Sequence, residues 1–362
     1  MGEQDQRFGW PAGAATGIGS MPGTDPAEAC RVVFGELPEF PFLPELPGRG
    51  PGADLAGRTA ALLVDMPVQV TPRGWKLTDR PGRDASRAAG YWSQDLDALE
   101  EIADGYTGSL KIQVCGPWTL AASLELSRSV NPVLADPGAV ADLTASLAEG
   151  LAAHAADVRK RIPAATLVIQ LDEPSLPAIL AGRIPTASGL SAIAAADRAV
   201  AAQRLAAVLS APAAAASRGD DPPNPPAATV VHCCGRVASA FPEILAAGAG
   251  AVSFDLDQLP VRETDRIAEL AEAGLGLLVG ALPTASAIWL PGGPPKDPRQ
   301  TAESVVTLWR RTALPDARFA AQVVVTPACG LAGVSPEAAR VALAHCREAA
   351  RVAAEMIEES AR

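Results

Sequence analysis

The sequence predicts an α/β protein, a single (β/α)8 barrel with loop insertions, for three reasons. The chain has 362 residues, which suits a barrel of about 250 residues with insertions. Short runs of β-branched residues alternate with long alanine-rich segments of helical periodicity. The strand candidates number eight, which is the count of a closed barrel. We therefore expect one domain that spans residues 1–362.

Near-continuous apolar runs mark the strands, as expected for parallel strands that are buried on both faces. The six clearest candidates are Lys111–Cys115, Thr166–Leu171, Thr229–His232, Ala251–Asp255, Gly276–Gly280 and Gln322–Thr326. Two further strands are expected near the N-terminal end, at Ala15–Gly19 and Ala61–Asp65.

Helices are predicted between these strands, for example at Pro137–Arg161 and Ser191–Leu209, where apolar residues recur with a period of 3.6. Asp136 and Ser335 each precede a proline, which is typical of a residue that caps the start of a helix.

The alternative fold is an open, doubly wound sheet, which would carry Gly-x-Gly-x-x-Gly after its first strand. The segment Gly17–Pro22 lacks the third glycine of that pattern, so the barrel is favoured. Two proline-rich segments, Gly219–Pro226 and Leu290–Pro298, are too short to link domains and are interpreted as insertions between barrel units.

The charge balance argues against a nucleic-acid partner. The chain has 30 Lys and Arg against 41 Asp and Glu, so its formal net charge is −11. No apolar run reaches the roughly 18 residues that a membrane span requires. The first seven residues are polar and do not resemble the apolar core of a signal peptide, so we expect a cytoplasmic protein with reduced cysteines.

A candidate zinc site emerges from the ends of three predicted strands. His232 and Cys234 are two residues apart on one strand, so their side chains point to the same side. Asp255 and Cys329 follow two other strands, and the carboxyl ends of all barrel strands meet on one face. These four residues offer the N, S, O and S ligands of a tetrahedral zinc site, with Asp257 as a second candidate for the carboxylate. The alternative is that the cysteines pack as small apolar residues.

Such a site favours thiol chemistry over hydrolysis. Two thiolates and one carboxylate outweigh the charge of a zinc ion, which makes it a weak generator of hydroxide. The same ion holds a substrate thiol as a thiolate, and a thiolate accepts carbon groups from electrophilic donors. A closed structural zinc site without a substrate position is the alternative.

The remaining cysteines and histidines are expected to pack in the interior. They are Cys30, Cys115, His154, Cys233, His345 and Cys346. Of these, only Cys115 ends a predicted strand and has a second possible place at the site.

The zinc-ligand candidates resemble the site of the catalytic domain of cobalamin-independent methionine synthase, where the ligands are His, Cys, Glu and Cys. Thr16–Pro22 resembles that family's Ile-Gly-Ser-Phe-Pro segment, and Gln170–Pro174 is similar to its Gln-Ile-Asp-Glu-Pro-Ala motif. Gly116–Leu120 is similar to its Gly-Pro-Val-Thr-Ile. The motifs follow the family order from residue 16 to residue 331, and together they are specific.

The resemblance implies a barrel enzyme that transfers a methyl group to the thiol of homocysteine and forms methionine. It implies that zinc is held by the four residues named above and that Ile18, Gly19 and Ser20 bind the amino-acid part of the substrate. Asp172 is the implied catalytic residue and binds the substrate amino group. An acid at a strand end also suits an ammonium group without the resemblance, although Asp172 could instead cap a helix before Pro174. Glu173 is expected to have a structural role.

Three departures from the family pattern bear on the methyl donor. Asp255 is one methylene shorter than the family's Glu, and Val279–Thr284 lacks the family's catalytic histidine. Full-length family enzymes are also about twice as long and use an N-terminal half to bind folate. We therefore expect a methylated corrinoid protein as the donor, because methylcobalt needs no acid to protonate a departing nitrogen.

Three other functions remain open at this point. They are alkyl transfer to another thiol of the coenzyme M type, decarboxylation of a porphyrinogen, and a zinc-binding or redox-responsive protein without enzymatic activity.

Overall fold

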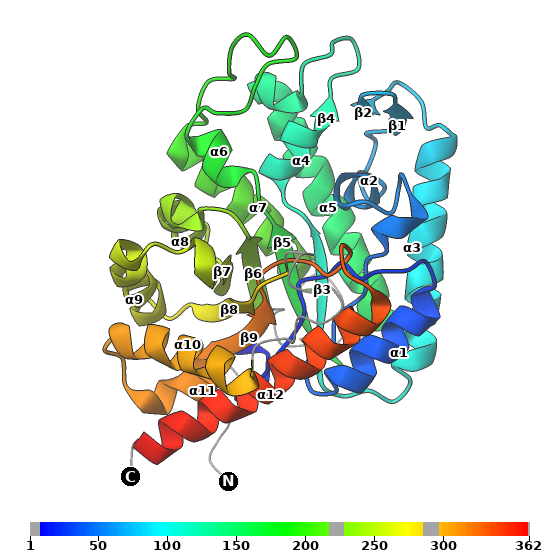
Figure 1. The fold of residues 1–362 in the computed structure, drawn as a ribbon. Coiled ribbons are helices and arrows are strands. Elements are labelled where there is room, and N and C mark those ends of the chain that lie inside the picture. Colours follow the sequence, from blue (N-terminus) through cyan, green and yellow to red (C-terminus); the bar gives the residue numbers. More distant parts are fainter. Residues whose placement is uncertain (1–7, 217–227, 285–296, 361–362) are drawn as a thin grey trace.

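A six-stranded parallel sheet forms the centre of the computed structural model, which describes residues 8–216, 228–284 and 297–360 (Figure 1). Its strands are β3 (Ser109–Cys115), β5 (Thr166–Asp172), β6 (Ala228–Cys233), β7 (Ala251–Asp255), β8 (Gly276–Leu282) and β9 (Val323–Pro327). Each strand pairs with the next one along the chain, in parallel. Because this order never reverses, the sheet is not doubly wound, and that alternative is wrong.

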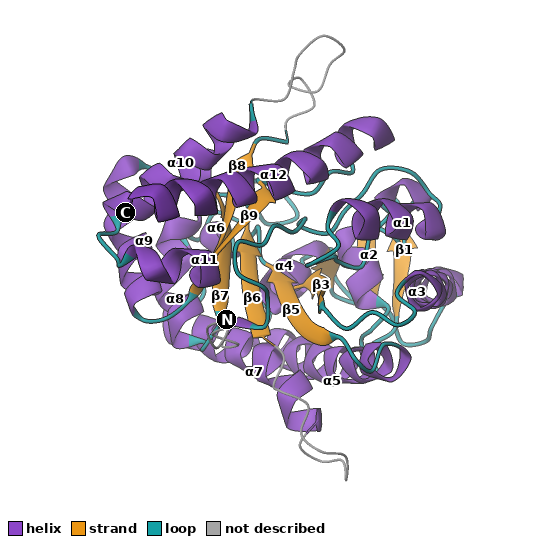
Figure 2. Ribbon diagram, turned by 90° about the horizontal axis from the view of Figure 1, so that it is seen from below, coloured by secondary structure: helices purple, strands orange, loops and turns teal. Residues whose placement is uncertain are grey.

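Helices surround the curled sheet on its outer side, as Figure 2 shows from below. They cross over from one strand to the next, and every residue of β3, β8 and β9 is buried between them and the interior. The longer helices are α1 (Pro26–Glu36), α3 (Arg83–Ile102), α5 (Pro137–Arg161), α7 (Arg198–Ala216), α9 (Thr264–Glu272), α10 (Pro298–Arg311) and α12 (Pro336–Ser360). Shorter ones are α2 (Leu55–Ala60), α4 (Pro117–Ser123), α6 (Leu176–Leu180), α8 (Phe241–Ala246) and α11 (Phe319–Gln322).

A second, small sheet lies beside α2 and α3. It contains β1 (Val68–Thr71), β2 (Gly74–Leu77) and β4 (Leu124–Glu125). Val68, Trp75, Leu77 and Leu124 are buried and join the main hydrophobic core, whereas the other residues of this sheet are partly or fully exposed.

Two extended segments, 14–20 and 41–45, connect the two edges of the main sheet. Isolated parallel bridges join Ala15 with β9, Phe42 with β3, and Ser20 with Glu45. The segments do not form regular strands, since Pro41 and Pro44 lack the N–H group that a ladder requires. The structure therefore shows six of the eight strands expected, and a closed eight-stranded barrel is not shown.

The strand predicted at Ala61–Asp65 is wrong. These residues follow the end of α2 as a turn, and Asp65 has a φ of 56°, which is incompatible with a strand. The strand predicted at Ala15–Gly19 is reduced to the bridge described above, where Gly17 and Gly19 interrupt the pattern.

The helix predicted at Pro137–Arg161 is confirmed as α5, and the side chain of Asp136 caps it by accepting from Gly138 and Ala139 N. The predicted helix at Ser191 begins later, at Arg198. The proline-rich segment 219–226 and residues 290–296 of the second one lie outside the described residues. Among the helices that the structure describes, none has the length and apolarity required to span a membrane.

Candidate functional site

Three of the four predicted metal ligands meet at one end of the sheet. One ligand atom each from His232, Cys234 and Cys329 lies within 4.8 Å of the others. His232 belongs to β6, Cys234 directly follows it, and Cys329 follows β9. Parallel strands bring their carboxyl ends to the same edge, so residues almost 100 positions apart come together there.

The imidazole of His232 is oriented for a ligand. Its Nδ1 is 2.8 Å from Ser253 Oγ on the neighbouring strand β7. Its Nε2 is buried and has no hydrogen-bond partner among the described residues. A buried unpaired nitrogen is costly, and one nitrogen held by a neighbour while the other stays free is the usual arrangement of a metal-binding histidine. The N, S, S donor set thus fits zinc.

The thiols of Cys234 and Cys329 interact with each other. A hydrogen bond from the Cys234 thiol, with help from His232, lowers the pKa of Cys329 to about 4 despite burial. The same hydrogen bond and burial raise the pKa of Cys234. Both residues are partly exposed, whereas Cys233, which directly precedes Cys234, is fully buried. The two thiols of the candidate metal site are therefore the accessible ones, and the lowered pKa of Cys329 favours its thiolate form.

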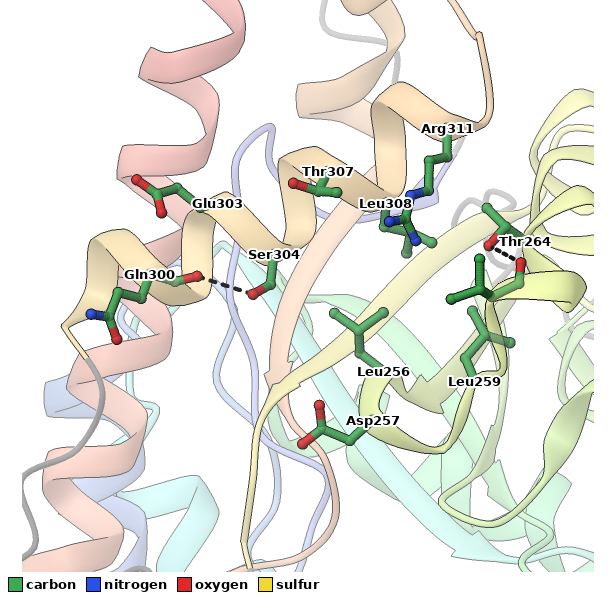
Figure 3. Close-up of a pocket in the computed structure, with 11 residues that line it drawn as sticks. Leu256, Asp257, Leu259, Thr264, Gln300, Glu303, Ser304, Thr307, Leu308 and Arg311 are labelled. Carbon is green, nitrogen blue, oxygen red and sulfur yellow. Dashed lines mark hydrogen bonds between the residues drawn. The ribbon is translucent and has the colours of Figure 1, made fainter.

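Neither candidate carboxylate joins this group. Asp255 is half-buried, and its Oδ1 accepts a hydrogen bond from Asp257 N at 2.9 Å, which caps the short 3-10 helix Leu256–Gln258. Burial raises the pKa of Asp255. Asp257 lines a separate pocket of about 470 Å³ beside α10, together with Ser304 and other residues (Figure 3). Asp255 as a fourth ligand stays a prediction.

The other cysteines and histidines pack in the interior, as expected. Cys30, Cys115, Cys233 and Cys346 are all buried. The ring of His154 lies 4.3 Å from that of Trp92, and His345 Nε2 is 2.9 Å from Thr301 Oγ1. Since the sequence has three histidines, His232 is the only one in the metal-binding group.

The predicted substrate segment Ile18–Ser20 lies directly beside the metal-binding group. Leu331 N donates to Ser20 O at 2.8 Å. A Cβ placed on Gly330 would lie 1.9 Å from Ser20 Oγ, so a side chain at this position would displace the Ser20 hydroxyl. The close approach of these two loops sets the serine hydroxyl near the candidate metal position.

Asp172 is the direct strand neighbour of His232, the candidate metal ligand. Strand register aligns Cys115, Asp172, His232 and Ser253 side by side across four neighbouring strands. Asp172 Oδ1 accepts from Gln170 Nε2 at 2.7 Å, and the same Nε2 lies 2.9 Å from Ile18 O. Burial and the charge of Glu45 raise the pKa of Asp172 well above its usual value.

Glu173, not Asp172, is the residue that caps a helix. Its carboxylate accepts from the backbone N–H groups of Trp118 and Thr119 and from the Thr119 hydroxyl, at 2.7 to 2.9 Å. These groups form the first turn of α4, so the carboxylate satisfies donors that have no partner inside the helix. The structural role expected of Glu173 is confirmed.

Two buried charged residues of the site were missed by the sequence analysis, Glu45 and Lys111. Glu45 is 5% exposed and its Oε1 is 3.9 Å from Arg58 Nε. Lys111 is fully buried, on the inner side of β3. The available signal was a lysine inside an otherwise apolar strand, since lysine is almost never fully buried unless it is paired.

Comparison with known proteins agrees with this geometry. The model of the family "Cobalamin-independent synthase, Catalytic domain" matches residues 13–352. A B12-independent methionine synthase from Shewanella sp. W3-18-1, solved in complex with selenomethionine, has a TM-score of 0.60 at 12% identity, and the alignment covers 97% of this chain and 99% of that one. A methyltransferase from Methanosarcina mazei has a TM-score of 0.54 at 15% identity, with 96% and 94% covered. At these identities the two structures support the fold alone.

No curated protein sequence matches the chain. The family match spans nearly all of the residues that carry the site, from the segment before Ile18 to beyond Cys329. The chain belongs to the family of cobalamin-independent synthase catalytic domains, a methyltransferase family related to methionine synthase.

Proposed function

We propose that the protein transfers a methyl group to the thiol of homocysteine in a zinc-dependent reaction that forms methionine. The observation that carries this proposal is the convergence of His232, Cys234 and Cys329 within 4.8 Å, with His232 Nε2 buried and unpaired among the described residues. The Shewanella methionine synthase, with the same fold, was solved with selenomethionine, the selenium analogue of the product proposed here.

His232, Cys234 and Cys329 would hold the ion with three protein ligands, the number found in catalytic zinc sites, and a substrate atom would be the fourth. A zinc ion there would lower the pKa of a substrate thiol and supply it as a nucleophilic thiolate. The protein's part is to hold the donor set: Ser253 fixes the imidazole of His232, and Cys329 is already ionised. A zinc-storage protein, by contrast, would be expected to complete the site with its own four ligands.

Homocysteine is the methyl acceptor in this proposal. Its amino and carboxylate groups would lie between Asp172 and the segment Ile18–Ser20. The carboxylates of Asp172 and Glu45 suit an ammonium group, and both are buried. Ser20 and the backbone near Ile18 then face the acceptor's carboxylate. Two buried acids disfavour an anionic thiol of the coenzyme M type, and they equally disfavour a porphyrinogen with many carboxylates.

The scaffold we propose is one barrel domain over residues 1–362 of the (β/α)8 type. In it, the segments 14–20 and 41–45 take the places of two strands between β9 and β3.

The methyl donor and the cytoplasmic location stay predictions. Residues Val279–Thr284 carry no histidine, and His154 and His345 are held elsewhere, so no imidazole other than that of His232 belongs to the metal-binding group. That composition suits a donor whose leaving group needs no proton, such as a methylated corrinoid protein.

The test starts from protein purified without a chelator, in which zinc is measured by plasma mass spectrometry. We expect about one zinc per chain and, by calorimetry, binding of homocysteine with release of the thiol proton. Homoserine, which has a hydroxyl in place of the thiol, is the matched control and should bind weakly. Methionine formed from methyl-folate or from methylcobalamin then identifies the donor class. Protein without bound zinc, or equal binding of homoserine, would contradict the proposal.

A further inference from the structure

Lys111 is a fully buried lysine that contacts the segment Ile18–Ser20 of the proposed acceptor site. Its Nζ donates to Ile18 O at 2.7 Å and to Gln113 Oε1 at 3.3 Å. It also lies 5.3 Å from the ring centre of Phe42. Two of its three N–H groups are thus satisfied by uncharged acceptors, which alone do not compensate a buried ammonium group.

The compensating charges come from two neighbouring elements. On β5, Gln170 Nε2 contacts both Ile18 O and Asp172 Oδ1, so the Ile18 carbonyl and the Gln170 amide link the Lys111 ammonium to the Asp172 carboxylate. On the segment 41–45, the carboxylate of Glu45 also interacts electrostatically with Lys111. Burial lowers the pKa of Lys111 only to about 8, because both carboxylates oppose the effect, so the ammonium form prevails at pH 7.

Glu45 also belongs to a chain of ion pairs in which cations and carboxylates alternate. Arg58 lies 3.9 Å from Glu45 and also pairs with Asp95, and Asp95 in turn pairs with Arg49 at 2.8 Å. The cluster therefore contains three cations and three carboxylates: Arg49, Arg58, Lys111, Glu45, Asp95 and Asp172. Their formal charges add to zero. Cys115 is the strand neighbour of Asp172, and burial raises the pKa of its thiol, which keeps it neutral.

We propose that Lys111 is a specificity-determining residue of the acceptor pocket, whose ammonium group brings the buried cluster to zero net charge and so restricts the acceptor to a zwitterion. A ligand with one ammonium and one carboxylate leaves the buried region neutral. A thiol with only one of these groups leaves an uncompensated charge in the interior, which is costly.

Lys111 also positions the backbone that faces the acceptor. It and Gln170 both hold the carbonyl of Ile18. In a trans peptide the C=O and the next N–H point in opposite directions, so the Gly19 N–H is directed away from these two side chains. The same lysine therefore sets both the charge of the pocket and the orientation of its backbone donor.

The inference rests on the proposed function, and its test compares three thiols by calorimetry on zinc-loaded protein. They are homocysteine, 4-mercaptobutyrate, which lacks the ammonium group, and 3-mercaptopropylamine, which lacks the carboxylate. Wild-type protein should bind homocysteine at least tenfold more tightly than either analogue. Lys111→Gln leaves the cluster with a net charge of −1, so the preference for homocysteine over 3-mercaptopropylamine should fall at least tenfold.

Lys111→Arg keeps the charge and should retain the wild-type preference, and Lys160→Gln on the exposed surface of α5 is the matched control. An unchanged preference in folded, zinc-loaded Lys111→Gln would overturn the inference. If that variant does not fold, the wild-type protein decides: equal binding of homocysteine and 3-mercaptopropylamine overturns the inference alone. No binding of any of the three thiols overturns the proposed function with it.

Discussion

The two halves of the candidate site differ in the chemistry of their side chains and in their burial. The metal-binding half, His232, Cys234 and Cys329, contains soft ligands, and its thiols are partly exposed. The acceptor half, around Lys111 and Asp172, contains formal charges that are buried and paired with one another. Because buried charges need partners in the folded protein, the acceptor half is preformed without a ligand, whereas the metal-binding half leaves a nitrogen unsatisfied until an ion binds. The following predictions separate the two halves, from the largest effect to the smallest.

The largest effect is expected for Cys329→Ser, which removes a thiolate ligand. Zinc affinity should fall by more than about 100-fold, so the purified variant should carry little metal. Cys233→Ser is the control, because Cys233 is buried away from the group and should keep its zinc. Metal analysis that finds full zinc in Cys329→Ser would remove this residue from the site.

Asp172→Asn should disable the acceptor half and leave the metal-binding half intact. We expect homocysteine affinity to fall by about 100-fold, roughly 3 kcal/mol, because a charged partner of the ammonium group is lost. Zinc content should not change. The adjacent variant Glu173→Gln should instead lower the free energy of unfolding by about 1–2 kcal/mol through the cap of α4. Loss of zinc in Asp172→Asn would show that the halves are not separable.

The acceptor half should also carry a pH dependence of stability through His154, which packs on Trp92 behind Arg58. Burial and then the charge of Arg58 lower the pKa of His154 from 6.5 to about 3. The folded protein therefore keeps this imidazole neutral, while the unfolded chain protonates it as the pH falls below 6.5. Stability from this residue is complete above pH 6.5 and is lost as the pH falls toward 3.

Between pH 7 and pH 5 this loss should amount to about 2 kcal/mol of unfolding free energy. Urea unfolding at both values measures it, and His154→Phe should reduce the difference by that amount. An unchanged difference in the variant would mean that other groups cause the acid sensitivity.

Ser253→Ala should weaken the metal-binding half moderately. The hydroxyl holds Nδ1 of His232 at 2.8 Å, and loss of such a partner lowers metal affinity by about 10-fold. Competition with a chelator of known affinity gives the value. Unchanged affinity would show that the imidazole is oriented by its packing alone.

The smallest effect is expected for Asp255→Asn, whose carboxylate already caps a 3-10 helix. We expect zinc affinity to change by less than about threefold, since the three-residue group stays complete. A loss as large as that of Cys329→Ser would instead establish Asp255 as a fourth ligand.

The metal-binding half of the site could be predicted from the sequence, whereas part of the acceptor half could not. His232 and Cys234 could be recognised because two-residue spacing on a strand is a local rule, and Cys329 followed from the convergence of strand ends. Lys111 and Glu45 could not, because their significance depends on distant partners. Lys111 contacts Ile18, which is 93 residues away, and no local pattern reveals that pairing.

The fold shows a similar limit. The six central strands were predicted because both faces of each are buried, which produces unbroken apolar runs. The segments 14–20 and 41–45 are rich in glycine and proline, and they pair only through isolated bridges that tertiary structure determines. The turn that ends at Asp65 resembles a strand in the sequence because Ala61–Val64 are all apolar, although they follow the end of α2.

The central claim is that the metal-binding half keeps one position for the sulfur of the acceptor. X-ray absorption at the zinc edge, with and without homocysteine, tests it most directly. The account predicts two sulfur ligands and one imidazole nitrogen from the protein, and a third sulfur when homocysteine binds. A zinc environment that homocysteine leaves unchanged would contradict it.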